Sequence, residues 1–402
     1  MRHSKGRWFG AALVIALLFC TGDGRAAYYN LAAFWRTPGG CTLWGWGSNS
    51  KGEIGLGYFS YWVGRNQIGT ATDWAQVVGG WSYAMALKKD GTLWGTGDNT
   101  YGQLGQGYFT AGPNYGLNTL TQVPGTWANV SAGQDGQGYT MAIKTDGTLW
   151  GGGENMYGSI SGPWAPWPYR VASPTQVGTD TDWAKVTAGV YSTLAIKTDG
   201  TLWGWGINSS GELGRGNWLT TQTREQSLGV NWAKVYLGRY HAVGIKTDGT
   251  IWAWGGYQFG ALGLGPAPVN LNIPTQIGTD TNWASVSAQG DRFTMAIKTD
   301  GTLWAWGYNA YGQLGLGDNV NRYVPTQVGT ETNWARVLVG GYWAGKTLAL
   351  KTDGTLWAWG SGSTNGLGLG DQSNHNIPTQ VGTDTKWVTV ASGFAYGMAI
   401  KR

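Results

Sequence analysis

The chain has 402 residues, of which 12% are charged and 70 are glycine. Gly and Pro together make up about a fifth of it, below the range typical of structureless low-complexity sequence. The formal net charge of +5 falls to +2 outside residues 1–27, and no run of Lys or Arg remains there. This balance argues against nucleic-acid binding.

The first 27 residues have the pattern of a secretory signal. Arg2, Lys5 and Arg7 form a positive segment, an apolar segment runs from Ala11 to Cys20, and small residues follow up to residue 27. The apolar segment is too short for a transmembrane helix. We therefore expect 1–27 to be a signal peptide and 28–40 a leader, with the mature protein secreted or periplasmic/extracellular and free of the membrane.

Two alternatives for this segment stay open. One is an uncleaved membrane anchor. The other is a lipid on Cys20, although Phe19 is bulky where lipidation sites carry a small residue. After cleavage Cys41 would be the sole cysteine, so we expect no intramolecular disulfide and a small buried apolar side chain rather than a reactive thiol.

The rest of the chain repeats one phrase, which is cleanest as KTDGTLW at 351–357. Its TLW part, once TIW, starts at seven positions, with spacings of 50, 56, 53, 49, 52 and 53 residues. Apolar runs on both sides of an Asp-Gly pair predict a β-hairpin with a two-residue type I′ turn. A period near fifty built from strands predicts a propeller. The seven starts are Thr42, Thr92, Thr148, Thr201, Thr250, Thr302 and Thr355.

Each unit follows one plan. A strand such as 201–206 is followed by a Gly-rich turn such as 311–317, a variable loop, a short PTQV strand such as 325–328, a GTxTxWAxV segment, and a strand such as 192–196. Four short strands per unit predict an all-β fold, a seven-bladed propeller of four-stranded antiparallel blades over 41–402. Nineteen repeat tryptophans are expected in its core, and the glycines beside them allow close approach of neighbouring strands.

The two ends of the chain are complementary parts of one blade. The first unit begins at 41–47 without its inner strands, and the chain ends at 387–402 without a following TLW. We therefore expect the N-terminal strand 41–47 to pair with the C-terminal strands 387–400. This pairing closes the ring and removes two open sheet edges.

The phrase TLWAWGYNAYGQLGLGD at 302–318 resembles the signature of the regulator of chromosome condensation repeat family, and the likeness covers 41–402. The resemblance implies a seven-bladed propeller. The family's name-giving eukaryotic member is an exchange factor for a nuclear GTPase and binds chromatin, a role that a secreted chain of weak charge does not suit. The same fold occurs in a secreted bacterial inhibitor of β-lactamases, so we expect a secreted bacterial-type member similar to it in fold. Fold alone does not decide function.

Family repeats often carry a His in the pattern GxxHSLAL, and here only His241 keeps it. Other units place different residues at the comparable position, namely Tyr83, Thr140, Ser192, Phe293 and Tyr396.

The sequence offers little chemistry. Only His241 and His375 lie outside the signal, with no cluster at metal-ligand spacing, so we expect no cofactor, no metal and no enzyme activity. Glu53 and Glu212 lie where other units have Gln, which favours a turn role over paired catalytic carboxylates. A cation-binding ring of the six turn aspartates is a weaker alternative, because it lacks the dense ligands of calcium loops.

The candidate site is a set of aromatic residues in four consecutive variable loops. Alternate connections of a four-stranded blade emerge at the same end, so we expect these loops to form one arc at the end opposite the KTDGT turns. Exposed aromatics are enriched in binding hot spots. The leading hypothesis is a protein-binding, possibly inhibitory, monomeric propeller. A carbohydrate-binding or lectin-like module is the alternative, a GTPase exchange factor is less favoured, and the loops could instead fold down over the blades. The candidate partner-binding residues are Tyr58, Phe59, Tyr61, Trp62, Tyr108, Phe109, Trp164, Trp167, Tyr169 and Trp218, with Tyr115 in the second loop.

Overall fold

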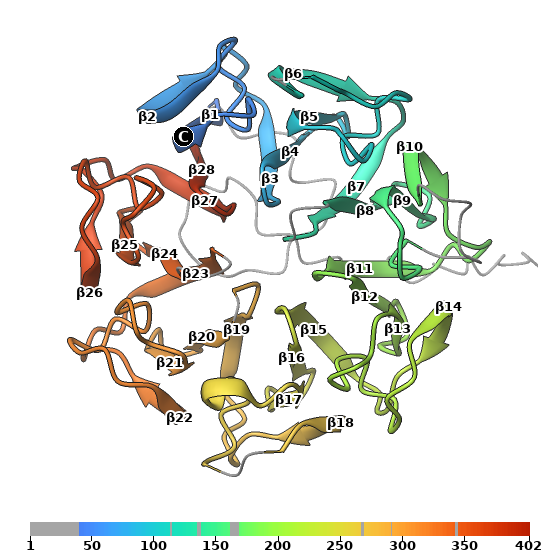
Figure 1. The fold of residues 1–402 in the computed structure, drawn as a ribbon. Coiled ribbons are helices and arrows are strands. Elements are labelled where there is room, and N and C mark those ends of the chain that lie inside the picture. The colour runs from blue at the N-terminus through green and yellow to red at the C-terminus, as the bar shows by residue number, and fades with distance from the viewer. Residues whose placement is uncertain are drawn as a thin grey trace, which may run out of the picture.

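The computed structural model describes residues 40–112, 115–134, 138–160, 169–266, 269–290, 292–341 and 345–402. Seven four-stranded antiparallel sheets are arranged around a central axis (Figure 1). This confirms the seven-bladed propeller. The described part of the chain holds no helix with the length and apolar character that spanning a bilayer requires.

Strands are best grouped by their distance from the axis. The innermost strands are β3 (Trp74–Gly79), β7 (Trp127–Ala132), β11 (Trp183–Ala188), β15 (Trp232–Leu237), β19 (Trp283–Ser287), β23 (Trp334–Gly340) and β27 (Trp387–Ser392). The second strands are β4 (Tyr83–Lys88), β8 (Tyr139–Lys144), β12 (Ser192–Lys197), β16 (His241–Lys246), β20 (Phe293–Lys298), β24 (Lys346–Lys351) and β28 (Tyr396–Lys401).

The third and outer strands complete each blade. The third strands are β1 (Thr42–Asn49), β5 (Leu93–Asp98), β9 (Leu149–Glu154), β13 (Leu202–Gly206), β17 (Ile251–Gly255), β21 (Leu303–Gly307) and β25 (Leu356–Gly360). The outer strands are β2 (Ser60–Ile68), β6 (Gly116–Val123), β10 (Arg170–Gln176), β14 (Thr221–Gln226), β18 (Leu271–Gln276), β22 (Arg322–Gln327) and β26 (His375–Gln380). A short 3-10 turn, η2 (Gln258–Gly260), precedes β18.

The ring closes as expected. β1 pairs antiparallel with β28, in a register that runs from Thr42 opposite Lys401 to Gly47 opposite Tyr396. β28 in turn pairs with β27, so the first blade is ordered β2-β1-β28-β27. In Figure 1 the blue strands β1 and β2 stand in one blade with the red strands β27 and β28.

The repeated hairpins form, but with a different turn. In the copy at 88–92, the Gly91 N–H donates to the Lys88 carbonyl (3.1 Å), and Gly91 has φ +84° whereas Asp90 is not among the residues with positive φ. A three-residue loop with a type I turn and a left-handed glycine fits these values, so the predicted type I′ turn is wrong. Asp90 accepts hydrogen bonds from the Thr92 N–H (2.9 Å) and hydroxyl (2.7 Å). These hydrogen bonds within the turn explain why the repeat has an aspartate at this position.

The repeat tryptophans occupy three kinds of position in the blades, which differ in burial. Those that begin the innermost strands are 1–4% exposed, and the second tryptophan of a third strand, as at Trp359, is fully buried. The Trp359 ring lies against Gly315, where a Cβ would meet Nε1 at 2.7 Å, so a larger residue there would displace it. The TLW tryptophans are half-buried rather than core. The Nζ of Lys351, for example, lies 3.8 Å from the ring centroid of Trp357, a cation–π contact that the other units repeat.

In five of the seven blades the side chain that begins the second strand bonds to the next blade, at Tyr83, Tyr139, His241, Lys346 and Tyr396. The Tyr396 hydroxyl donates to the Gly80 carbonyl (3.3 Å), and the Lys346 Nζ donates to the Gly393 carbonyl (2.8 Å) in the same way. By strand register the residue of the third blade at this position is Tyr139, which pairs with Gly153, so the assignment of Thr140 is wrong by one residue. Lys346 was not expected here, because its unit lacks the recognisable aromatic.

Cys41 is fully buried, as expected. It is disulfide-bonded, which contradicts the expectation of an unbridged thiol. The other cysteine of the chain, Cys20, lies outside the described residues, as do the predicted signal and leader up to residue 39.

Candidate binding surface

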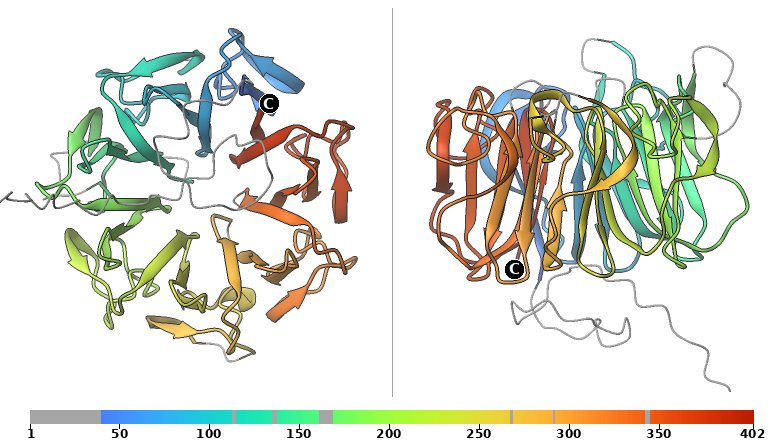
Figure 2. Two further views of the ribbon diagram at one scale, coloured as in Figure 1. Left: turned by 180° about the vertical axis from the view of Figure 1, so that it is seen from behind. Right: turned by 90° about the horizontal axis from the view of Figure 1, so that it is seen from below.

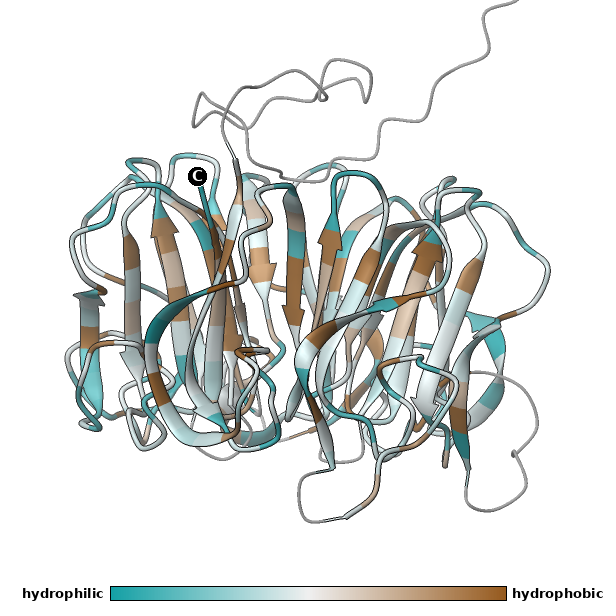
Figure 3. Ribbon diagram, turned by 90° about the horizontal axis from the view of Figure 1, so that it is seen from above, coloured by the Kyte–Doolittle hydropathy of each residue, from teal (hydrophilic) through white to brown (hydrophobic). Residues whose placement is uncertain are grey.

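The two ends of the ring carry different connections. At one end, here called the loop end, the innermost strand joins the second and the third joins the outer strand. At the other, the turn end, lie the short KTDGT turns, the links between blades and the C-terminus (Figure 2). Figure 3 shows apolar residues concentrated within the strands and hydrophilic ones in many connections. This division of the connections agrees with the prediction from blade topology.

A buried asparagine organises the start of the long loop in five of the seven blades, at Asn49, Asn99, Asn155, Asn208 and Asn309. Asn99 accepts a hydrogen bond from the Leu104 N–H (3.0 Å) through Oδ1, and its Nδ2 donates to the Tyr108 carbonyl (2.8 Å). Asn49 holds the Tyr58 carbonyl in the same way, at 2.6 Å. Because both amide groups are fully buried, these loops display Tyr58 and Tyr108 from a backbone that is tied to the blade.

Buried Glu or Gln side chains support the same turns. Glu53, Gln103, Glu212 and Gln313 each accept a hydrogen bond from the backbone N–H two residues earlier, at 2.7–2.9 Å. Burial raises the pKa of Glu212 to about 7, and that of Glu53 is raised for the same reason. The turn role predicted for both glutamates is confirmed.

The predicted aromatic residues that the structure describes fall on four consecutive blades, but not all of them lie in loops. Tyr61 and Trp62 are the second and third residues of β2, the outer strand, and are 84% and 60% exposed. Their assignment to the loop is wrong, because the strand begins at Ser60, which pairs with Asn49. They remain at the loop end of that strand.

The other described candidates differ in exposure. Tyr58, Tyr108, Phe109 and Trp218 lie in loops and are each about half exposed, whereas Phe59 and Tyr169 are half-buried. Tyr115 is also half-buried, and the Lys51 Nζ lies 3.3 Å from its ring centroid. Trp164 and Trp167 lie outside the described residues.

Exposure at the loop end extends beyond the predicted arc. Leu219 is exposed beside Trp218 in the loop between β13 and β14. Phe259 and Val269 are exposed in the corresponding loop of the next blade and Val320 in that of the blade after it, and Tyr323 is exposed at the start of β22. Sequence reasoning missed them because it searched only for clustered aromatic residues. Among the described residues, every strongly exposed aromatic side chain lies in a third-to-outer connection or at the start of an outer strand.

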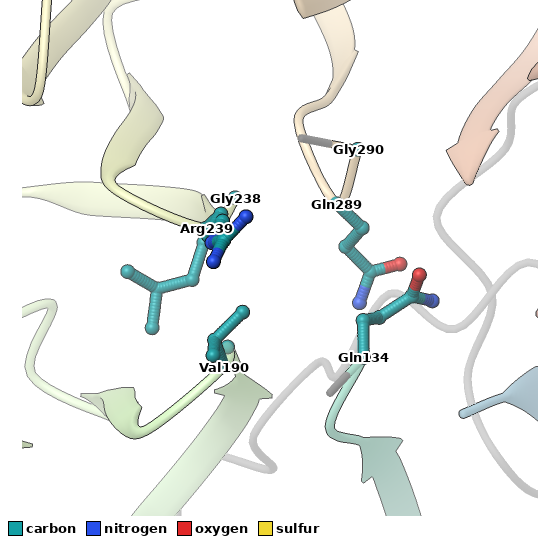
Figure 4. Close-up of a pocket in the computed structure, with 8 residues that line it drawn as sticks. Gln134, Val190, Gly238, Arg239, Gln289 and Gly290 are labelled. Atoms are coloured by element: carbon teal, nitrogen blue, oxygen red, sulfur yellow. The ribbon is translucent and has the colours of Figure 1, made fainter. Parts of the chain in front are cut away.

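A small hollow lies near the axis at the loop end (Figure 4). Gln134, Arg239 and Gln289 come from three different innermost connections, and Figure 4 shows the two carboxamides facing one another. The Gln134 Nε2 also donates to the Gly79 carbonyl (2.9 Å) and the Ser392 carbonyl (3.1 Å). It therefore links three consecutive blades.

The two histidines of the described residues, His241 and His375, both make structural contacts. His241 is 1% exposed, its Nε2 lies 3.3 Å from the Thr294 hydroxyl, and burial lowers its pKa to about 4. His375 pairs with the exposed carboxylate of Asp371 at 3.2 Å. Within the described ranges no three His, Cys, Asp or Glu residues gather as a metal site would require.

Comparison with proteins of known sequence finds repeats of one family along the chain. The model of the regulator of chromosome condensation (RCC1) repeat matches residues 248–297, 300–343 and 353–400, and a second model of the same repeat matches 74–103, 183–212, 232–260 and 283–313. The ultraviolet-B receptor UVR8 of Arabidopsis thaliana is 29% identical over 197 residues, which are 48% of this chain and 44% of the receptor. The mitochondrial RCC1 domain-containing protein RUG3 of the same plant is 33% identical over 134 residues, 32% of this chain and 29% of RUG3. The chain thus matches less than half the length of these relatives.

Solved structures share the architecture. Human WBSCR16 superimposes with a TM-score of 0.79 at 18% identity, covering 90% of this chain and all of that one. Yeast RCC1 (Prp20), in its structure bound to Kap60, gives 0.79 at 17% identity, covering all of this chain and 95% of that one. At such identity these likenesses show the fold alone. The repeat matches, which together cover more than half of the chain, show that this chain belongs to the regulator of chromosome condensation (RCC1) repeat family.

Proposed function

We propose that the chain is an exported, non-catalytic module that binds a protein partner through its loop end and the adjoining starts of the outer strands. One observation carries the proposal: the strongly exposed aromatic side chains of the described residues all lie on this side of the ring. Large exposed aromatics are unfavourable in water and are enriched among binding hot spots.

Export enters the proposal through the N-terminal sequence. Positive residues, an apolar segment of ten residues and small residues near 27 form the order of a signal peptide. The yeast relative named above is seen with a protein, Kap60. A secreted chain would meet other partners, and inhibition of an extracellular enzyme, as by a propeller-type β-lactamase inhibitor, is the finer form of the proposal.

Capture from the culture medium of the native host tests this function. The mature chain is immobilised, and bound proteins are cross-linked and identified by mass spectrometry. The variant Tyr61→Ala/Trp62→Ala removes two of the most exposed aromatic rings. Leu228→Ala/Val230→Ala is the matched control, since these residues are 45% and 50% exposed at the turn end.

We expect the wild type and the control to retain one protein, and the aromatic variant to lose about tenfold or more in affinity at an unchanged Tm. Equal capture by the wild type, the aromatic variant and the control would show that this surface does not bind the partner. A collapse of Tm in the aromatic variant would mean that the rings support the fold instead. Binding to a glycan array with no captured protein would favour the carbohydrate-binding alternative.

A further inference from the structure

The residues around the ring axis carry an unbalanced charge. The seven innermost strands stand around this axis in Figure 1, and the axial region that they surround is here called the central channel. These strands share the pattern Trp-x-x-Val, and none of them contains an aspartate or glutamate. The third position of the pattern holds Lys185 on β11, Lys234 on β15 and Arg336 on β23.

The three cations lie along the channel wall. Each donates to the innermost strand of the next blade: Lys185 Nζ to the Ala233 carbonyl, Lys234 Nζ to the Ala284 carbonyl, and Arg336 to the Thr389 hydroxyl. Such bonds require the side chains to run around the ring axis, rather than outward into the blades. All three residues are half-buried, so part of each remains open to solvent.

No carboxylate balances this charge among the described residues. None of the three cations takes part in an ion pair there. Burial, followed by the Lys234 charge, lowers the pKa of Lys185 to about 8, and burial with the Arg336 charge lowers that of Lys234. The charge of Lys234 thus disfavours protonation of Lys185, and the charge of Arg336 disfavours protonation of Lys234. A buried or half-buried cation without a counter-charge is costly, and a bound anion relieves that cost.

Hydroxyl groups occupy the equivalent positions beside them. Ser285 on β19 stands in the blade between Lys234 and Arg336, and Thr389 follows on β27. Hydroxyls and cationic donors together suit an anion with several acceptor oxygens, and guanidinium and ammonium groups are both common ligands of phosphate. We propose that Lys185, Lys234 and Arg336, with Ser285 between them, form a binding site for a small oxyanion of the phosphate class in the central channel.

The test uses the mature full chain and inorganic phosphate, with sodium chloride at matched ionic strength as reference. Affinity is measured by isothermal titration calorimetry, and the Tm is recorded with and without phosphate. Lys234→Gln and Arg336→Gln remove one charge each. Glutamine is a fitting replacement, because Gln76 holds the same position on β3 and donates to the Val130 carbonyl of the next blade (3.1 Å). Lys386→Gln, at an exposed position of the turn end, is the control for net charge.

We expect one phosphate per chain, a Tm rise beyond that of matched chloride, and a loss of about tenfold or more in affinity for Lys234→Gln and Arg336→Gln but not for Lys386→Gln. Should either channel variant fail to fold, Lys185→Gln takes its place with the same expectation. The proposal is overturned if the wild type shows no phosphate-specific heat or Tm rise. It is equally overturned if the channel variants and the control bind phosphate alike.

Discussion

Glu212 is a buried residue whose negative charge is unfavourable in its surroundings. It is 1% exposed, and its carboxylate accepts a hydrogen bond from the Ser210 N–H (2.8 Å). Burial raises its pKa from 4.5 to about 7. Between these values the unfolded chain has lost a proton that the folded chain still holds, so the stability of the fold decreases as pH rises from about 4.5 to 7.

Glu212→Gln is therefore expected to stabilise the protein above pH 7, by up to about 3 kcal/mol, and to flatten the pH dependence between 4.5 and 7. The free energy of urea unfolding at several pH values measures this. Gln103 and Gln313 already make the same bond in other blades, so the amide fits the site. Glu53→Gln should gain less, because the Ser48 hydroxyl (2.6 Å) stabilises the ionised form of Glu53. If the free energy of unfolding of Glu212→Gln depends on pH as strongly as that of the wild type, the pKa of Glu212 is not raised as stated.

Single residues were the hardest level to predict from the sequence. The turn role of Glu212 followed from comparing the repeats, since other units have Gln at that place. Lys185, Lys234 and Arg336 were missed because a cation in one repeat of a strand pattern looks like ordinary surface variation. Only the closed ring shows that the third positions of all innermost strands meet around one axis.

At the level of elements, the second and third strands were predicted almost to the residue, because their apolar runs and the Asp-Gly pair bound them on both sides. The turn type was not, since an Asp-Gly pair serves both a two-residue loop and a three-residue loop with a left-handed glycine. The outer strands were less certain as well. β2 carries exposed Tyr61 and Trp62, and nothing in their sequence separates an outer strand from a loop.

Strand β28 is the element on which closure of the ring depends. It pairs with β1 on one side and β27 on the other, and Tyr396, Met398 and Ile400 are fully buried. Deleting 387–402 exposes the β1 edge and the apolar faces of the adjoining blades. We expect loss of the cooperative unfolding transition and aggregation in light scattering. Deletion of Arg402 alone, which is exposed, is the control and should unfold like the intact chain. An unchanged thermal transition in the longer deletion would show that the fold does not depend on ring closure by β27 and β28.

At the scale of the whole molecule, the number of blades and their closure followed from the repeat period and its phase, and both are confirmed. The functional face was only partly predictable. Blade topology indicated which connections share an end, but exposure depends on how each loop packs, so Phe59 and Tyr169 are half-buried while Leu219 and Val320 are exposed. The repeat pattern is explained by packing within and between the blades, so it carries no information about the binding partner.

The last prediction concerns where the molecule works. Arg2, Lys5 and Arg7 precede an apolar segment that is too short to span a bilayer, and small residues follow it. In its native host the chain should therefore lose its first residues and appear outside the cytoplasm, beginning at Ala27 or Tyr28. Mass spectrometry of the N-terminal peptide from cell fractions measures both. Leu17→Arg places a charge in the apolar segment and should retain the chain in the cytoplasm at full length, whereas Ser4→Ala, a neutral change outside that segment, should leave export unaltered. An exported protein that still begins at Met1 or Arg2 would show that the segment is an anchor, and the search for a soluble extracellular partner would then move to the cell surface.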